Sequence, residues 1–334
     1  NRYAPDKAAE QASRCSQCGV PYCSVHCPLG NHIPDWLRLT AEGRLREAYE
    51  LSNLTSSMPE ICGRICPQDR LCEGNCVIEF SGHGAVTIGS VEKYITDTAW
   101  AEGWVEPIEV GPARGQSVGI IGAGPGGLTA AEQLRIAGYD VHVYDRNDRM
   151  GGLLTYGIPS FKLEKDVVMR RIDRLAEGGV VFHANFEVGR DASLDDLRVK
   201  HDSILIATGV YKARDMKTPG IGLSGIHAAL DYLTASNRKG FGDTVAEFDN
   251  GTLHSKADPE EGNFVFPYIP DSLNLSFQTT FTKTGRNQHA IDGGQDWGNG
   301  IFCNIFRRNP CQIHFTIIIR TGMNECLGNR FISI

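Results

Sequence analysis

The sequence predicts an α/β protein in which an α-helical, cysteine-rich N-terminal domain precedes a Rossmann-type domain. Two observations predict this order. Eight of the eleven cysteines fall between Cys15 and Cys76, and none lies between residues 77 and 302. A strand, a glycine-rich turn and a helix then follow one another from Ser117. A chain of 334 residues has room for two or more domains, and we place them at residues 1–110 and 111–256, with an unassigned tail at 257–334.

Composition and charge argue against nucleic acid and membranes as partners of the protein. The formal net charge of −7 offers no basic surface for nucleic acid or for an anionic membrane. No apolar run approaches the roughly 18 residues of a spanning helix, and the first residues contain no signal-peptide core. We therefore expect a cytoplasmic protein that binds neither nucleic acid nor membrane. Residue 1 is Asn, which indicates a fragment, so a lost upstream targeting segment stays open.

The first 110 residues are predicted to be short helices joined by cysteine-bearing loops. In residues 34–54, apolar side chains recur at roughly helical spacing, which predicts a pair of packed helices; they are Trp36, Leu37, Leu45, Ala48, Tyr49 and Leu51. The stretch from Trp100 to Arg114 contains two prolines and two glycines and is predicted to be a linker.

The cysteines form two runs whose spacing favours iron–sulfur clusters. The first run is Cys15, Cys18, Cys23 and Cys27, and the second is Cys62, Cys66, Cys72 and Cys76. Pro28 and Pro67 each follow a cysteine directly, as in bacterial ferredoxins, where the last cysteine of a run ligates the other cluster. Two such runs indicate two interlocked clusters. Structural zinc remains an alternative, although zinc sites usually pair two short knuckles across a longer spacer. Disulfides are the least favoured option in a reducing cytosol.

Residues 118–145, VGIIGAGPGGLTAAEQLRIAGYDVHVYD, predict a βαβ unit that binds a dinucleotide. Gly122 permits the tight turn, Gly124 lets the backbone approach a pyrophosphate, and Gly127 lets helix and strand pack closely. The helix N-terminus favours the phosphate charge, and Asp145 is placed to accept hydrogen bonds from ribose hydroxyls. The whole turn is Gly122, Ala123, Gly124, Pro125, Gly126 and Gly127. These residues leave open whether the ligand is FAD or NAD(P), and residues 203–209, SILIATG, predict a further strand.

Several segments resemble one protein family. RCSQCGVPYCSVHCPLGNHIPDWLRL, GRICPQDRLCEGNCV and VTIGSVEKYITDTAW closely resemble the small (β) subunit of bacterial NADPH-dependent glutamate synthase. They resemble the N-terminal domain of dihydropyrimidine dehydrogenase more loosely. RNDRMGGLLTYGIPSFKLEK and SILIATG resemble the segments that follow the flavin-binding unit in that family. The resemblance covers about residues 3–256.

The resemblance implies two [4Fe-4S] clusters with crossed ligation, and FAD as the dinucleotide. One cluster would take Cys15, Cys18, Cys23 and Cys76, and the other Cys27, Cys66, Cys72 and the carboxylate of Glu92. A solvated helix position is the alternative for Glu92, because a carboxylate is a hard ligand. Cys62 would be a spare thiol. The further FAD contacts implied are Gly151, Gly152, Leu153, Thr208 and Gly209.

For function, the resemblance implies electron input. NADPH would reduce FAD, and the clusters would pass electrons to a large (α) subunit that makes glutamate from glutamine and 2-oxoglutarate. No side chain is expected to act as an acid, base or nucleophile. The family's NADPH-binding unit is not found after residue 256, since DGGQDWGNG at 292–300 follows no strand, and Cys303, Cys311 and Cys326 are interpreted as incidental thiols. We therefore expect an incomplete FAD domain, at best partial uptake of iron and flavin, and no reduction by NADPH.

Two other functions remain open from the sequence. One is a related flavin and iron–sulfur NAD(P)H oxidoreductase with another acceptor. The other is a non-catalytic, cluster-bearing subunit, because the NADPH site is missing.

Overall fold

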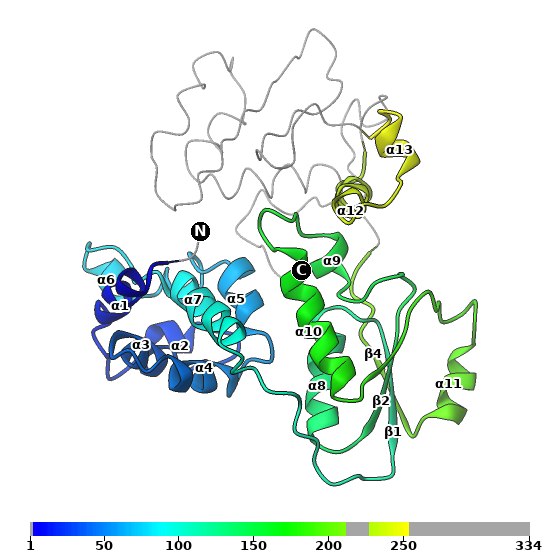
Figure 1. Cartoon of the computed structure of the whole chain (residues 1–334), viewed down its shortest axis with the longest axis horizontal. Coiled ribbons are helices and arrows are strands. Elements are labelled where there is room, and N and C mark those ends of the chain that lie inside the picture. Colours follow the sequence, from blue (N-terminus) through cyan, green and yellow to red (C-terminus); the bar gives the residue numbers. More distant parts are fainter. Residues whose placement is uncertain (1–2, 212–226, 254–334) are drawn as a thin grey trace. The chain divides into compact units, whose positions relative to one another are not determined.

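The computed structural model describes residues 3–211 and 227–253 (Figure 1). The predictions made for the tail, including DGGQDWGNG and the last three cysteines, lie outside the described residues. The chain divides into two compact units. The first spans Asn1–Gly151 and Lys162–Thr208, and the second spans Gly152–Phe161 and the chain from Gly209. Within the described part of the chain, no helix is both long enough and apolar enough to cross a membrane.

The first unit begins with short helices around a buried core that contains Trp36, Leu37 and Ile95. The predicted pair of packed helices in residues 34–54 is confirmed as α3 and α4. At Gly63 in α5 the backbone of α7 is so close that a Cβ atom would lie 2.7 Å from the Lys93 amide nitrogen. The seven helices are α1 (Pro5–Ser13), α2 (Tyr22–Val25), α3 (Ile33–Ala41), α4 (Leu45–Asn53), α5 (Pro59–Ile65), α6 (Val77–Phe80) and α7 (Ile88–Ala101).

The predicted linker starts slightly later than expected. Trp100 and Ala101 still belong to α7, and the helix ends at Glu102 as its C-cap. The Trp100 ring packs beneath the guanidinium of Arg170, 4.6 Å from the ring centroid, which favours a helical last turn. The linker prediction was therefore wrong by about two residues at its start.

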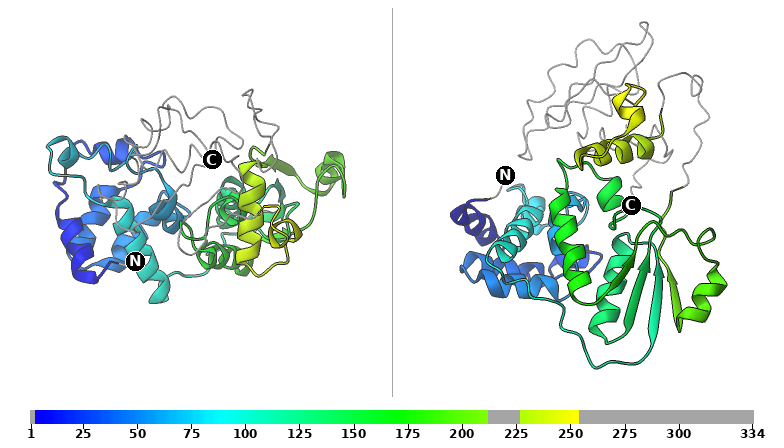
Figure 2. Two further views of the ribbon diagram at one scale, coloured as in Figure 1. Left: turned by 90° about the horizontal axis from the view of Figure 1, so that it is seen from above. Right: turned by 45° about the vertical axis from the view of Figure 1, so that its right-hand side comes forward.

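The rest of the first unit is a parallel sheet with helices on both faces (Figures 1 and 2). Its strands are β1 (Ser117–Ile121), β2 (Asp140–Tyr144), β3 (Val181–His183) and β4 (Ser203–Ile206), in the order β3-β2-β1-β4. Helices α8 (Pro125–Ile136) and α10 (Lys165–Glu177) cover one face, and α11 (Leu194–Lys200) lies on the other. The predicted βαβ unit is confirmed, and the predicted strand at 203–209 ends at Ile206.

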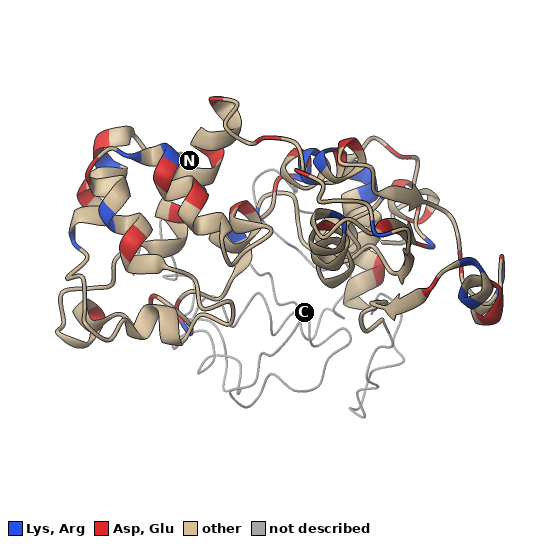
Figure 3. Ribbon diagram, turned by 90° about the horizontal axis from the view of Figure 1, so that it is seen from below, with Lys and Arg blue, Asp and Glu red and all other residues tan. Residues whose placement is uncertain are grey.

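Local sequence explains where these helices begin and end. Pro125 begins α8, where its missing N–H is no loss, and Gly138 follows the helix with φ at +89°. Ser193 and Asp196 form a capping box at the start of α11, which has acidic residues in its first turn and basic ones in its last. Acidic and basic residues are likewise interspersed along the other helices of the first unit (Figure 3).

The described part of the second unit is helical. It contains α9 (Leu153–Tyr156), α12 (Ala229–Gly240) and α13 (Ala246–Asp249). Helix α12 packs on α9 through the buried side chain of Asn237, whose Nδ2 donates to the Tyr156 carbonyl at 2.9 Å. The Arg238 guanidinium lies 5.2 Å from the centroid of the Tyr156 ring. These two contacts fix α12 on α9 within the second unit.

Candidate cofactor sites

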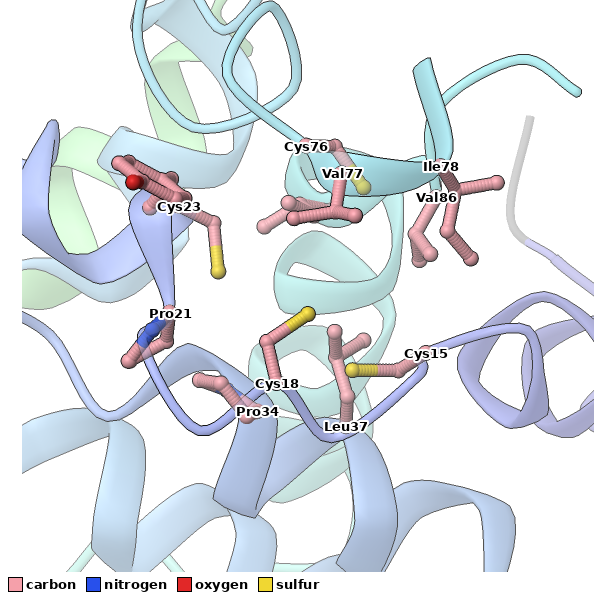
Figure 4. Close-up of a pocket in the computed structure, with 12 residues that line it drawn as sticks. Cys15, Cys18, Pro21, Cys23, Pro34, Leu37, Cys76, Val77, Ile78 and Val86 are labelled. Carbon is pink, nitrogen blue, oxygen red and sulfur yellow. The ribbon is translucent and has the colours of Figure 1, made fainter. Parts of the chain in front are cut away.

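Four cysteines from both runs line one pocket in the helical part of the first unit (Figure 4). They are Cys15, Cys18, Cys23 and Cys76. Figure 4 shows their four sulfur atoms pointing toward a common space. The remaining lining is mostly apolar and includes Leu37, Val86 and Ile88. The structure thus gathers the same four thiols that the resemblance assigns to one cluster.

Local backbone geometry aims the first loop into this pocket. Gln17 adopts a left-handed conformation with φ at +50°, which turns the chain between Cys15 and Cys18. Its side-chain amide donates to the Cys15 sulfur at 3.3 Å and to the Pro34 carbonyl at 2.8 Å. Cys76 comes from the other run and is the N-cap of α6. The pocket therefore closes only when the two runs pack together.

Burial controls the charge of these thiols. It raises the pKa of Cys15, and it raises the pKa of Cys23 to about 11. The neighbouring thiol of Cys76 adds to both shifts. At neutral pH the Cys15 and Cys23 thiols are therefore protonated, and binding of a metal cluster would release their protons.

The other cysteines gather with Glu92 in a second group. Burial raises the pKa of Cys72, and the nearby Glu73, Glu92 and Cys27 raise it further. The Cys62 thiol contacts the Cys66 thiol, and this contact together with burial raises the pKa of Cys62 well above its usual value. We call Cys27, Cys62, Cys66, Cys72 and Glu92 the second cysteine group.

Glu92 is buried in α7, so the alternative of a solvated helix position is wrong. Burial raises the pKa of its carboxyl well above the usual range, and the nearby Cys62 and Glu60 add to the shift. The close approach of α5 and α7 at Gly63 explains why this carboxyl lies beside the cysteines of α5. The position suits a ligand, whereas burial without a partner would be costly for a carboxylate.

The donor set of both groups fits iron–sulfur clusters. Soft thiolates in an apolar, half-buried pocket are the usual ligands of a [4Fe-4S] cluster. Within the described ranges, no three Cys, His, Asp or Glu side chains converge to hold a single metal ion. Ligands of a four-iron cluster surround a larger group, and each binds its own iron atom.

The glycine-rich turn lies at the carboxyl ends of the central strands. A parallel sheet of order β3-β2-β1-β4 changes direction between β1 and β4, and a dinucleotide binds in the crevice at such a switch point. Gly122 directly follows β1, with φ at +107°, and a Cβ atom there would collide with the Ala207 carbonyl oxygen. The turn and the segment containing Thr208 are therefore neighbours in space, as predicted contacts of one ligand should be.

The glycines of the turn serve different purposes. A Cβ atom on Gly127 would collide with the carbonyl oxygen of Gly122, so Gly127 permits the close packing of helix and turn. Gly124 and Gly126 face open space, with no atom within 4 Å of a built Cβ. The open side at the N-terminus of α8 is where a pyrophosphate would be held by backbone N–H groups.

Asp145 follows β2 and organises the wall of the crevice. Its Oδ2 accepts from the Ala123 N–H at 2.8 Å, and its Oδ1 accepts from the backbone and side-chain amides of Asn147 at 2.9 Å. The Gly151 N–H donates to the Ala123 carbonyl at 2.9 Å, which brings the glycine doublet to the same turn. A carboxylate has four lone-pair sites, so Asp145 can accept from a ribose as well. Gly152, Leu153 and Gly209 belong to the second unit, and their roles stay predictions.

Cys62, which the resemblance leaves as a spare thiol, lies beside Cys66 and near Glu92 in the structure, and its role stays a prediction. Sequence reasoning missed one feature of these sites. It gave no role to Glu60, whose buried carboxylate accepts two hydrogen bonds from Arg171. Local spacing carries no signal for a pair separated by 111 residues.

Comparison with known families defines the class of protein. Residues 1–104 match the family described as dihydropyrimidine dehydrogenase domain II, 4Fe-4S cluster. Residues 120–168 match the NAD(P)-binding Rossmann-like domain. The chain is therefore an α/β protein with a 4Fe-4S domain followed by a Rossmann-like dinucleotide-binding domain, as predicted.

The particular relatives are small chains of glutamate synthase. The chain is 68% identical to the glutamate synthase [NADPH] small chain of Azospirillum brasilense over 254 residues, which cover 76% of this chain and 53% of that protein. It is 46% identical to the Escherichia coli small chain over 247 residues, or 73% of this chain and 52% of that protein. The predicted resemblance to this family is confirmed. The chain spans about half the length of these curated relatives.

Other likenesses are broader. The putative oxidoreductase UacF of Escherichia coli is 46% identical over 236 residues, covering 70% of this chain and 37% of that protein. Among solved structures, FprA of Mycobacterium tuberculosis in complex with NADPH gives a TM-score of 0.34 at 23% identity, over 36% of this chain and 29% of that chain. That likeness is too slight to bear on function.

Proposed function

We propose that this chain is part of the electron-input subunit of a glutamate synthase, in which electrons pass from NADPH through FAD and two [4Fe-4S] clusters to a large subunit, and that residues 1–256 supply the cluster and FAD sites. The observation that carries the proposal is the pocket of four cysteines drawn from two distant runs, within the same unit as a glycine-rich turn at a sheet switch point. The identity of 68% to a glutamate synthase small chain supports the same role.

The chain's own residues would bind and orient these groups. The N-terminus of α8, with Gly124, would hold the pyrophosphate, and Asp145 would orient the ribose. Cys15, Cys18, Cys23 and Cys76 would hold one cluster, and Cys27, Cys66, Cys72 and Glu92 the other. When bound, a flavin accepts a hydride and releases electrons singly, which iron–sulfur clusters carry onward. The apolar lining of the first pocket would keep water from its cluster.

A related oxidoreductase with another acceptor is the second candidate. The 46% identity to UacF equals that to the Escherichia coli small chain, so identity at this level does not separate the two. The 68% identity to the Azospirillum small chain favours glutamate synthase.

The test begins with anaerobic purification of the whole chain, followed by counts of iron, acid-labile sulfide and flavin. We expect iron and sulfide in equal amounts and a flavin spectrum. Zinc in place of iron and sulfide would overturn the cluster assignment. The reduced chain is then mixed with a glutamate synthase large subunit, glutamine and 2-oxoglutarate. Glutamate formation supports the first candidate, whereas oxidation of the chain only by other acceptors supports the second.

A further inference from the structure

A layer of buried charged residues connects the second cysteine group with the dinucleotide-binding part of the first unit. At its centre, Glu60 in α5 accepts two hydrogen bonds from Arg171 in α10, at 2.7 and 2.8 Å. Both side chains are buried, with 2% or less exposed. A two-point pair between a carboxylate and a guanidinium fixes orientation as well as distance.

The layer continues into the helix that begins at the glycine-rich turn. Arg171 lies 3.7 Å from the carboxylate of Glu132 in α8, and Arg174 also pairs with Glu132. Beside them, the Gln133 side chain donates to the Ser57 hydroxyl at 3.1 Å, two residues before α5. Two short links therefore join the helix that carries Cys62 and Cys66 to the helix that begins at the dinucleotide turn.

A second set of ion pairs reinforces the first. Asp97 in α7 accepts two hydrogen bonds from Arg64 in α5, at 2.8 and 2.9 Å, and one from Arg170 in α10, at 3.2 Å. Arg64 also donates to Glu164, just before α10, at 2.8 Å. Helix α5, which carries Cys62, and helix α7, which carries Glu92, are thus both tied to α10.

The layer is poorly arranged for stability alone. Trp100 Nε1, Arg170 Nε and Glu132 Oε2 are buried and have no hydrogen-bond partner among the described residues. Desolvation offsets most of the gain from buried ion pairs, and apolar side chains of similar volume often stabilise a fold more. Fixing the register of two packed elements is the best-attested use of such pairs.

We propose that Glu60 and Arg171, supported by Glu132 and Asp97, are positioning residues that hold the second cysteine group at a fixed distance and orientation from the dinucleotide crevice. The inference rests on the proposed function, because electron transfer between two bound groups requires a fixed separation. The pair itself binds neither group. Its role is to keep α5 from moving relative to α8 and α10.

The experiment uses the full chain loaded anaerobically with iron, sulfide and FAD. Arg171→Met removes the central pair at nearly constant volume. Glu60→Gln combined with Arg171→Met removes the pair without leaving the Glu60 carboxylate buried and unpaired. Arg135→Met is the matched control, because within the described residues Arg135 hydrogen-bonds to Gly178, Tyr139 and Asp140 and to no residue of α5. Flavin is photoreduced, and the rate of cluster reduction is followed together with the flavin–cluster distance by electron paramagnetic resonance (EPR).

We expect Arg171→Met and the double variant to slow cluster reduction about several-fold relative to Arg135→Met, because the rate depends on how precisely the two reacting groups are positioned. Their iron and flavin contents should equal those of Arg135→Met. A general folding defect would lower these contents as well. A wild-type rate and distance in both variants would overturn the proposal. If Arg171→Met does not fold, Glu60→Leu with Arg171→Leu replaces it and is judged by the same criteria.

A separate measurement keeps this inference distinct from the proposed function. Hydrogen exchange of residues 102–116 and of α5 needs no cofactor. Faster exchange in Arg171→Met than in Arg135→Met supports the positioning role even in a chain that takes up no flavin. Equal exchange in both variants counts against it, whatever the cofactor content.

Discussion

Gly122 lies directly against the backbone of Ala207, so the end of β1 and the end of β4 meet without room for a side chain between them. This contact lies at the carboxyl ends of β1 and β4, at the switch point of the sheet. Gly122 is therefore required for packing, whereas Gly124 in the same turn faces open space where the pyrophosphate would bind.

Replacing Gly122 by alanine should mainly lower stability, whereas replacing Gly124 by alanine should mainly impair flavin binding. Gly122→Ala places a Cβ against the Ala207 carbonyl at a positive φ, so it should lower the free energy of unfolding by roughly 2–4 kcal/mol. Gly124→Ala meets no atom and should cost within about 1 kcal/mol, yet abolish flavin binding by blocking the pyrophosphate. Urea unfolding and flavin titration measure the two effects. Tight flavin binding by Gly124→Ala would contradict the assigned site.

Cys76 should be required for one cluster only. Cys76→Ser removes one of the four thiols that line the first pocket, so we expect loss of roughly half the iron and of one cluster signal in the EPR spectrum. Cys62→Ser is the matched control, since Cys62 lies outside that pocket. Full iron content in Cys76→Ser would show that the assignment of Cys76 to this cluster is incorrect, and loss of iron in Cys62→Ser would show that Cys62 is not a spare thiol.

Glu92→Ala should alter the other cluster. The buried carboxyl lies near Cys62 and Cys72, so its removal should shift the potential or the EPR signal of one cluster and leave the other unchanged. Glu79→Ala serves as a control on α6, outside both cysteine groups. Redox titration followed by EPR makes the comparison. Two unchanged signals in Glu92→Ala would exclude Glu92 as a ligand.

A cluster of histidines on the sheet should make stability depend on pH. The ring nitrogens Nδ1 of His142 and Nε2 of His183 share a hydrogen bond of 3.0 Å, and His201 Nε2 is hydrogen-bonded to the Tyr144 hydroxyl at 2.8 Å. Burial and the charge of Lys200 lower the pKa of all three histidines below 6.5, and neighbouring imidazoles add to the shift at His183 and His201, while Asp140 and Asp202 oppose it at His142 and His201.

The direction in which stability changes with pH follows from proton binding by these histidines. Below pH 6.5 the unfolded chain takes up protons that the folded histidines resist, so the stabilising contribution is complete above pH 6.5 and is lost as the pH falls. We expect the free energy of unfolding to fall between pH 7 and pH 5, by an amount that screening by water reduces. His183→Gln should flatten this slope in urea unfolding, and the exposed His83→Gln should leave it unchanged. An identical slope in His183→Gln and the unmodified chain would refute the explanation.

Much of the local structure was predictable because its signals are local. Helical spacing in residues 34–54 and the strand, turn and helix from Ser117 are each set by neighbours within a few residues. The last turn of α7, Trp100 and Ala101, was missed because the distant Arg170, which stacks on the Trp100 ring, gives no local signal. The meeting of Cys76 with the first three cysteines was implied by family resemblance, since spacing within a run does not show which run supplies the fourth thiol.

The sequence by itself determined which residues carry the chemistry: two runs of thiols, a glycine-rich turn after a strand, and an acid at the end of the next strand. Only the tertiary structure decided how they are combined. It placed Cys76 in the first pocket, buried Glu92 beside Cys62, set Gly122 against Ala207, and paired Glu60 with Arg171. The physical reason is range, because turns and helix ends follow from contacts within a few residues, whereas these pairs form only when packing brings distant helices and strands together.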